Sequence, residues 1–142
     1  MSIQQNKDLV RLATERGINQ GELDFVDDVF ASDYVVHATG VDLPPGPDAF
    51  RAAVGLWRTA FPDFHMTIED MIGEDDLVAV KFTTTGTHRG PLLDIPPTGR
   101  TFTVSGADMH RVRDGRVVES WISDDFPRIL LEIGALGEGA PA

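Results

Sequence analysis

The sequence contains no cysteine, and this absence excludes several kinds of chemistry. A chain without thiols has no disulfide framework, no thiolate nucleophile and no cysteine-ligated zinc. Long apolar runs are missing too. No segment approaches about 18 uninterrupted apolar residues, so we expect no membrane-spanning helix. The first residues, MSIQQNKDLVRLATERG, are polar and amphipathic, unlike a signal peptide, and we therefore expect a cytoplasmic protein.

Basic residues are also scarce. Of 142 residues, 12 are Lys or Arg and 23 are Asp or Glu, which gives a net charge of −11. A negative field repels phosphate backbones and anionic membranes, so we expect neither nucleic acid nor a membrane as partner. An uncharged or weakly polar small molecule is easier to accommodate. The length is sufficient for one hydrophobic core, and we predict a single domain over residues 1–142 with a frayed tail over about 134–142.

The apolar period changes from 3.6 residues to two after the FPDF segment at 61–64. The expected helices span residues 5–16, 22–30, 48–60 and 126–133. The expected extended segments span residues 34–37, 65–72, 77–88, 101–112 and 116–123. Helices followed by antiparallel strands predict an α+β domain, with the helices packed on one face of a curved sheet.

The segment GADMHRVRDGRVVESWISDDF, residues 106–126, is typical of a β-hairpin and carries a notable pair of polar side chains. Asp108 and His110 lie two residues apart on one predicted strand, so they share a face of the sheet. If that face points inward, a carboxylate and an imidazole are buried side by side. The pair is then either catalytic or a hydrogen-bonded structural detail.

Two hairpin registers fit the turn. A two-residue loop at 114–115 would set Arg113 opposite Arg116 and Asp108 opposite Trp121. A three-residue loop would set Asp108 opposite Ser120. We favour the three-residue loop because it avoids two arginines directly opposite each other. The inward face would then comprise Phe102, Val104, Gly106, Asp108, His110, Val112, Val118, Ser120 and Ile122.

Several segments of the sequence resemble the SnoaL-like polyketide cyclase family, which belongs to the superfamily of ketosteroid isomerase and nuclear transport factor 2. They are INQGELDFVDDVFASDYVVH, GPDAFRAAVGLWRTAFPDFHMTIEDMI, GTHRGPLLDIPPTGRTFTVSG and RVRDGRVVESW followed by ILLEIGAL. The resemblance covers about residues 6–136. It implies a cone-shaped curved antiparallel sheet, with N-terminal helices on its concave face enclosing an apolar pocket. It also implies a bacterial enzyme of secondary metabolism and a homodimer joined through the outer sheet face.

The resemblance implies a mechanism that this chain does not reproduce intact. In the family, an Asp near the end of the last strand acts as acid/base in an aldol closure, assisted by a His on the preceding strand. Those positions hold Ile122 and Asp108 here. A carboxylate would instead enter the cavity from the neighbouring strand, where Asp108 is a diagonal neighbour of position 122. Apolar neighbours would desolvate it and raise its pKa, which suits an acid/base.

Other side chains complete the candidate site. His110 and His37 are further catalytic candidates, although His37 fits a surface histidine equally well. Asp124 or Asp125 is expected to cap the last helix, while Asp124 also faces inward by parity. The expected substrate-binding residues are Tyr34, Phe50, Trp57, Phe82, Ser120, Ile122 and Asp124.

We expect neither a metal nor a cofactor. His37, His88, His110 and Asp108 are suitable ligands for zinc or iron, but no local spacing supports such a site. The sequence also shows no P-loop, dinucleotide fingerprint or nucleophile elbow. Chemistry would therefore run on proton transfers alone.

Our first hypothesis is a cofactor-free cyclase or isomerase acting on an apolar, carbonyl-bearing metabolite, polyketide-like or terpenoid-like, with Asp108 as the acid/base. Two alternatives stay open. One is a non-catalytic binding module, as Ile122 at the family's Asp position would allow. The other is epoxide hydrolase-type activity, which needs a second carboxylate, such as Asp124, beside Asp108.

Overall fold

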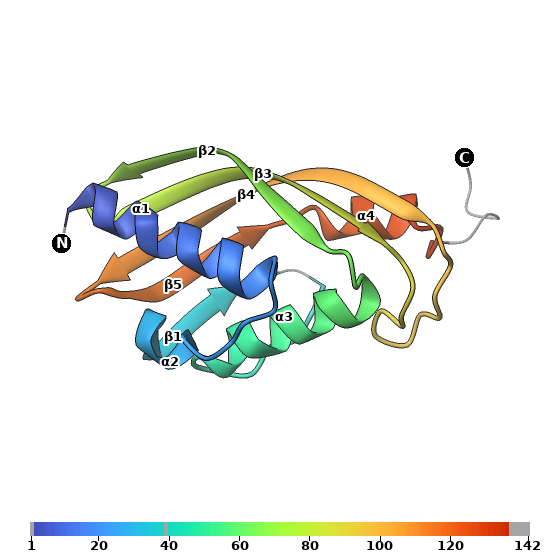
Figure 1. The fold of residues 1–142 in the computed structure, drawn as a ribbon, viewed down its shortest axis with the longest axis horizontal. Helices are drawn as coiled ribbons and strands as arrows, with labels where there is room; N and C mark the ends of the chain where they lie inside the picture. The colour runs from blue at the N-terminus through green and yellow to red at the C-terminus, as the bar shows by residue number, and fades with distance from the viewer. Residues whose placement is uncertain (1, 39, 137–142) are drawn as a thin grey trace.

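One five-stranded sheet organises the chain in the computed structural model, which describes residues 2–38 and 40–136 (Figure 1). In chain order the elements are α1 (Ile3–Leu12), η1 (Ala13–Ile18), α2 (Val26–Val29), β1 (Phe30–His37), α3 (Asp48–Ala60), β2 (His65–Glu74), β3 (Leu77–Thr87), β4 (Thr101–Arg113), β5 (Arg116–Ser123) and α4 (Phe126–Glu132). The strand order is β1-β5-β4-β3-β2. Figure 1 shows the sheet bending over α1 and α3, which lie on the same side of it. The α+β class is confirmed; most of the predicted tail lies outside the described residues.

The first helix begins at a capping box. Ser2 Oγ accepts the backbone N–H of Gln5 at 3.1 Å, and Gln5 Oε1 accepts the N–H of Ser2 at 2.9 Å. These bonds satisfy N–H groups that a helix start leaves unpaired. From Ala13 the helix continues as the π-helix η1. The prediction of one regular helix over residues 5–16 is therefore wrong in its last turn.

The edge strand β1 differs most from the sequence prediction. It begins at Phe30, within the segment predicted as a helix, and it shortens α2 to four residues. It runs parallel to β5, with Phe30 opposite Val117 and His37 opposite Trp121. The prediction of a wholly antiparallel sheet is wrong at this edge. Because its partner strand β5 lies far along the chain, no local hairpin pattern in the sequence indicates this pairing.

The turn between β4 and β5 is the two-residue loop at 114–115, not the predicted three-residue loop. Asp114 and Gly115 both have positive φ, 52° and 76°, as a type I′ turn requires. Arg113 does pair with Arg116. The repulsion between these two arginines is offset by the carboxylate of Asp76, because Arg113 Nε donates to Asp76 Oδ2 at 3.1 Å.

A bulge then shifts the register beyond this turn. It falls between Arg111 and Val112, and past it Asp108 lies directly opposite Ile122 and His110 opposite Ser120. The shift also makes Val117 the buried residue, where Val118 was predicted to point inward. Asp108 and position 122 are therefore direct cross-strand neighbours, closer than the predicted diagonal pair.

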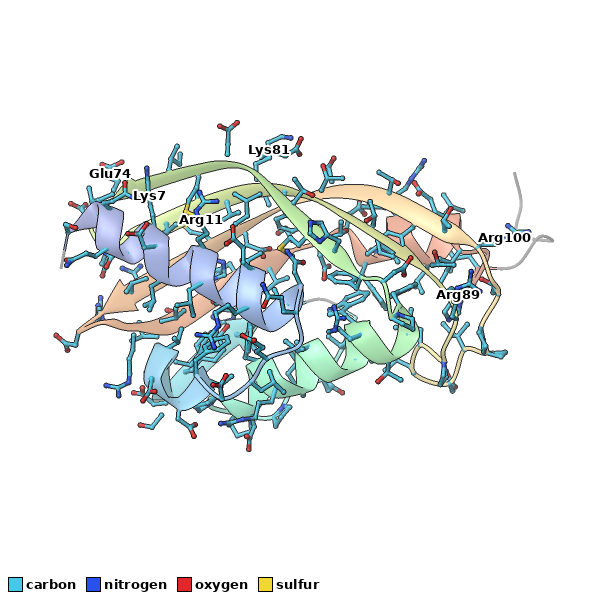
Figure 2. All side chains as sticks on the ribbon, in the orientation of Figure 1. Lys7, Arg11, Glu74, Lys81, Arg89 and Arg100 are labelled. Atoms are coloured by element: carbon cyan, nitrogen blue, oxygen red, sulfur yellow. The ribbon has the colours of Figure 1, made fainter. Side chains whose placement is uncertain are left out.

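The charged side chains labelled in Figure 2 lie on the outside of this framework. Figure 2 shows Lys7 and Arg11 near α1, Glu74 at the end of β2, and Arg89 and Arg100 at the opposite end of the molecule. The interior between these ends contains two apolar clusters. None of the described helices combines the length and apolar character needed to cross a bilayer.

Asn19 joins the end of η1 to the edge strand β2. Its Nδ2 donates to the carbonyl oxygen of Met66 at 2.9 Å, and its Oδ1 accepts the N–H of Met66 at 2.7 Å. One side chain thus satisfies both backbone groups of an edge residue. This contact fixes the helical layer relative to the sheet.

We expect Asn19→Ala to lower the free energy of unfolding by about 1–3 kcal/mol, because both Met66 groups would lose their partner. Urea unfolding followed by tryptophan fluorescence measures the effect. The control is Gln20→Ala, one residue further on and exposed. Equal midpoints for the two variants would show that the Asn19 contact contributes little.

Candidate active site

An apolar cavity lies between the helices and the concave face of the sheet. Its space free of protein atoms, including the solvent at its mouth, is about 1150 Å³. Residues from α1, η1, β1, α3 and all four remaining strands line it, and both apolar clusters contribute to its wall. The aromatic part of the wall comprises Phe30, Tyr34, Phe50, Trp57 and Phe64. Such a cavity suits a largely apolar small molecule.

Asp108 is the most perturbed carboxyl group on this wall. It is half-buried on β4, facing the cavity opposite Ile122. Burial raises its pKa to about 7, the N–H of Ser123 lowers it, and the nearby charge of Asp124 raises it further. Asp108 Oδ1 accepts that N–H at 3.1 Å. The carboxyl group is thus poised to gain or lose a proton near neutral pH.

Asp124 lines the same cavity and is also half-buried. Burial raises its pKa, and the N–H groups of Asp124 itself and Phe126 lower it. The N-cap of α4 is Asp125, in a left-handed backbone conformation and without a side-chain bond to the described helix. Of the two residues predicted to cap α4, Asp125 makes no such bond, whereas the Asp124 carboxyl group interacts with the N–H of Phe126, the first residue of the helix. Asp124 is a second carboxyl group near Asp108.

His110 faces the cavity from β4, two residues after Asp108. Burial lowers the pKa of its imidazole to about 4, so the ring is neutral at physiological pH. Its Nδ1 lies 2.7 Å from Ser120 Oγ on the neighbouring strand. Ser120 is fully buried, which makes its hydroxyl inaccessible to a substrate despite this Ser–His geometry.

Tyr34 supplies a phenol from β1, on the other side of Ser120. Burial raises the pKa of the phenol to about 12, the Ser120 hydroxyl lowers it, and the charge of Asp108 raises it. The phenol therefore keeps its proton and can donate it in a hydrogen bond. We call Tyr34, Asp108, His110 and Ser120 the polar cluster.

Three predicted site residues do not line the main cavity, and one of them is the fully buried Ser120 described above. His37 is exposed outside the main cavity, where its Nε2 is 2.7 Å from Glu119 Oε2 and its ring stacks on Trp121 at 5.6 Å. Phe82 is fully buried in the core beneath the cavity wall. Of the others, Phe50, Trp57, Ile122, Tyr34 and Asp124 line the cavity as predicted from their faces.

Arg58 also lines the cavity, although it was not among the predicted site residues. Its Nη1 donates to the carbonyl oxygens of Ile18, Asn19 and Phe64 at 3.2, 3.0 and 3.3 Å. The guanidinium thereby ties α3 to the end of η1 and to the segment before β2. Arg58 directly follows Trp57 on α3, and this position beside the apolar stripe could have indicated that it faces the cavity.

No group of three or more His, Asp or Glu side chains is arranged to hold a metal ion among residues 2–38 and 40–136. His88 is fully buried, with its Nδ1 accepting the N–H of Thr98 at 3.2 Å. Of the four side chains considered as ligands, only Asp108 and His110 line the cavity together, while His37 and His88 lie elsewhere.

The sequence model of the SnoaL-like polyketide cyclase family matches residues 8–133. Nogalonic acid methyl ester cyclase of Streptomyces nogalater is 31% identical over 118 residues, covering 82% of this chain and 88% of that enzyme. Aklanonic acid methyl ester cyclase DauD of Streptomyces sp. (strain C5) is 34% identical over 140 residues, covering 94% and 83%. Among solved structures, TsrD from Streptomyces laurentii has a TM-score of 0.84 at 26% identity, covering 96% of this chain and 99% of that one. The cavity lining, from Val10 to Ile129, falls inside the matched region.

Asp108→Asn should stabilise the protein increasingly as pH rises from 4 to 8. An unfolded aspartate ionises near its usual pKa of about 4, whereas the folded Asp108 holds its proton up to about 7. Ionisation therefore favours the unfolded wild-type chain over this window, by on the order of 2–4 kcal/mol at its upper end. The asparagine variant lacks this penalty and keeps an acceptor for Ser123.

Urea unfolding of both proteins at several pH values measures the difference. Asp33→Asn, on the exposed side of β1, is the matched control. A stability difference between Asp108→Asn and wild type that is constant across pH would contradict the burial of this charge.

Proposed function

The chain belongs to the SnoaL-like polyketide cyclase family, and from this we propose a cofactor-free cyclase or isomerase acting by proton transfer on an apolar, carbonyl-bearing metabolite. The substrate would be polyketide-like or terpenoid-like. The observation that carries the proposal is Asp108, a carboxyl group with a pKa raised to about 7 in a largely apolar cavity. A group that titrates near the working pH serves well as both base and acid.

The proposed reaction is an intramolecular aldol closure. The Asp108 carboxylate takes a proton from the carbon next to a carbonyl group, which leaves an enolate. The enolate carbon attacks a second carbonyl carbon of the same molecule, forming the new C–C bond and an alkoxide. Protonated Asp108 then returns its proton to the alkoxide oxygen. All atoms of the substrate remain in the product, and the carboxylate is regenerated.

Neutral donors on the same wall would stabilise the enolate oxygen. His110 is uncharged because burial lowers its pKa to about 4, and Tyr34 keeps its phenolic proton. Preorganised donors in a site that excludes water stabilise developing negative charge strongly. Both side chains line the cavity with Asp108.

The position of Asp108 is compatible with the family's chemistry despite Ile122. The resemblance places the working carboxylate at position 122, and Asp108 is the direct cross-strand partner of that position. Side chains so paired have Cβ atoms about 5 Å apart. A carboxylate from β4 can therefore serve the same part of the cavity, while the Ile122 side chain keeps it dry.

The second candidate is epoxide opening, and Asp124 is the observation that favours it. Two carboxyl groups in one cavity could divide the work, one deprotonating a water molecule and the other protonating the epoxide oxygen. The product would then contain one added water. A pure binding module would instead return its ligand unchanged.

We also propose a homodimer through the outer sheet face, with the protein in the cytoplasm as expected from its sequence. Met109 is 40% exposed on that face and lies opposite Trp121. Trp121 is flanked by the stacked His37 ring and by the Arg111 guanidinium, 5.8 Å from the indole centre. Such aromatic and arginine side chains are enriched at interfaces.

Asp108→Asn should lower kcat/KM by about 10²–10⁴-fold. Aklanonic acid methyl ester and nogalonic acid methyl ester are suitable probes, with the product identified by mass spectrometry. Because the base must be ionised, wild-type activity should rise with pH and reach half its maximum near pH 7. Binding, followed by tryptophan quenching, should change little.

Asp124→Asn separates the two reactions. For cyclisation it should leave most activity, and the product should have the mass of the substrate. Loss of activity in both variants, with a product heavier by one water, would favour epoxide opening. Undiminished turnover by Asp108→Asn would refute the proposed role.

Met109→Glu should shift the proposed dimer to monomer, because a charge would be desolvated at its interface. Sedimentation velocity at micromolar concentration measures the association. The control is Thr67→Glu, exposed on the edge strand β2. A wild-type protein that sediments as a monomer would contradict the proposal.

A further inference from the structure

Gly17 lies in the π-helix η1, whose residues Ala13, Thr14 and Ile18 line the cavity. Gly17 itself is buried, and its φ is not positive, so any other residue could adopt the same backbone conformation. Glycine destabilises a helical turn relative to alanine, because it has more backbone freedom to lose. A glycine at this position therefore has another physical reason, namely the space that its missing side chain leaves.

The ring of Phe50 occupies that space. A Cβ atom added to Gly17 would lie 2.6 Å from Cζ and 2.7 Å from Cε2 of Phe50, and 3.1 Å from Cζ of Phe25. Carbon atoms pack at separations of about 3.5–4.0 Å, so an added methyl group and the Phe50 ring could not both keep these positions.

The neighbours of the Phe50 ring determine the direction in which it can yield. The ring stacks on Phe30 with centroids 4.5 Å apart and an interplanar angle of 30°, and the Phe25 centroid lies 6.2 Å away. Both neighbours are buried in the core. Phe50 also lines the cavity. A methyl group on Gly17 would therefore displace the ring into the cavity and narrow it.

The same aromatic wall leads to the polar cluster. Phe30 meets Tyr34 edge-on, with centroids 4.8 Å apart at 65°. Phe50, Phe30 and Tyr34 thus form a continuous surface from η1 to the proposed reaction site, and all three line the cavity. The width at Phe50 limits the size of a ring system that can lie along this wall with one end at the polar cluster.

We propose that Gly17 is a specificity-determining residue, which leaves room for the Phe50 ring and so sets the largest apolar ring system that the cavity accepts. It is a positioning residue that acts through Phe50, because Phe50 lines the cavity and Gly17 lies behind it. The consequence for turnover rests on the proposed function, in which the substrate is an apolar metabolite bound in this cavity.

Binding of neutral aromatic probes to the full chain tests the size limit. Naphthol is bicyclic and hydroxypyrene is tetracyclic, and the fluorescence of each probe reports its binding. We expect the wild type to bind both. Gly17→Ala should raise the Kd of hydroxypyrene by about 10-fold or more and that of naphthol by less than about 3-fold, because only the larger probe needs the space taken by the displaced ring.

A second substitution identifies the ring as the cause. Gly17→Ala/Phe50→Leu should regain hydroxypyrene binding, because leucine lacks the two ring atoms that the added methyl group would meet. The matched control is Gly55→Ala on α3, an exposed position where an added Cβ would have no described atom of another element within 4 Å. This control should bind both probes as the wild type does.

Wild-type affinity of Gly17→Ala for hydroxypyrene would overturn the proposal. So would a wild type that does not bind hydroxypyrene, because the room at Gly17 would then admit no large ring system. Should Gly17→Ala fail to fold, the double variant carries the test. It should fold and bind hydroxypyrene within about 3-fold of Phe50→Leu. An unfolded or non-binding double variant would show that the overlap is not with Phe50, and would overturn the proposal.

Turnover provides a separate readout. With nogalonic acid methyl ester, Gly17→Ala should raise KM by about 10-fold and leave kcat nearly unchanged, because a poorer fit weakens binding of the ground state and the transition state alike. The probe experiment does not depend on turnover. A shifted size limit with a fully active Asp108→Asn would refute the proposed function alone, whereas an unshifted limit with an inactive Asp108→Asn would refute this inference alone.

Discussion

Polar groups buried among apolar side chains must find partners or change protonation, and this constraint shapes the whole cavity wall. The wall shows both responses. The hydroxyl of Ser120 lies 2.7 Å from Nδ1 of His110, and the His110 ring remains neutral because burial lowers its pKa to about 4. Asp108 has one backbone donor, Ser123, so its carboxyl group favours the protonated form until neutral pH. The reactivity proposed for the site is thus a direct consequence of incomplete solvation.

The alternation of apolar residues predicted much of this arrangement. A two-residue period identified the strands and placed Asp108 and His110 on one inward face, and the helical stripe with Phe50 and Trp57 indicated the opposite wall. These features depend on local spacing. The resemblance to the cyclase family further predicted the cavity and the packing of the helices on the concave side of the sheet.

Three of the errors involve residues distant in sequence. The hairpin register depends on Asp76, which binds Arg113 from another turn and makes the two-residue loop acceptable. The parallel pairing of β1 joins segments more than 80 positions apart, as the His37–Glu119 contact illustrates. Phe82 shares its alternation with true cavity residues, but neighbouring side chains cover it. Single-sequence spacing carries no information on such coverage.

The amide of Asn19 has a consequence for the behaviour of the protein in a crowded solution. β2 is an edge strand, and an open edge can recruit a strand from another molecule into a growing sheet. At Met66 the amide already occupies both backbone groups that such a strand would need. A contact that positions the helical layer also guards this stretch of edge against aggregation.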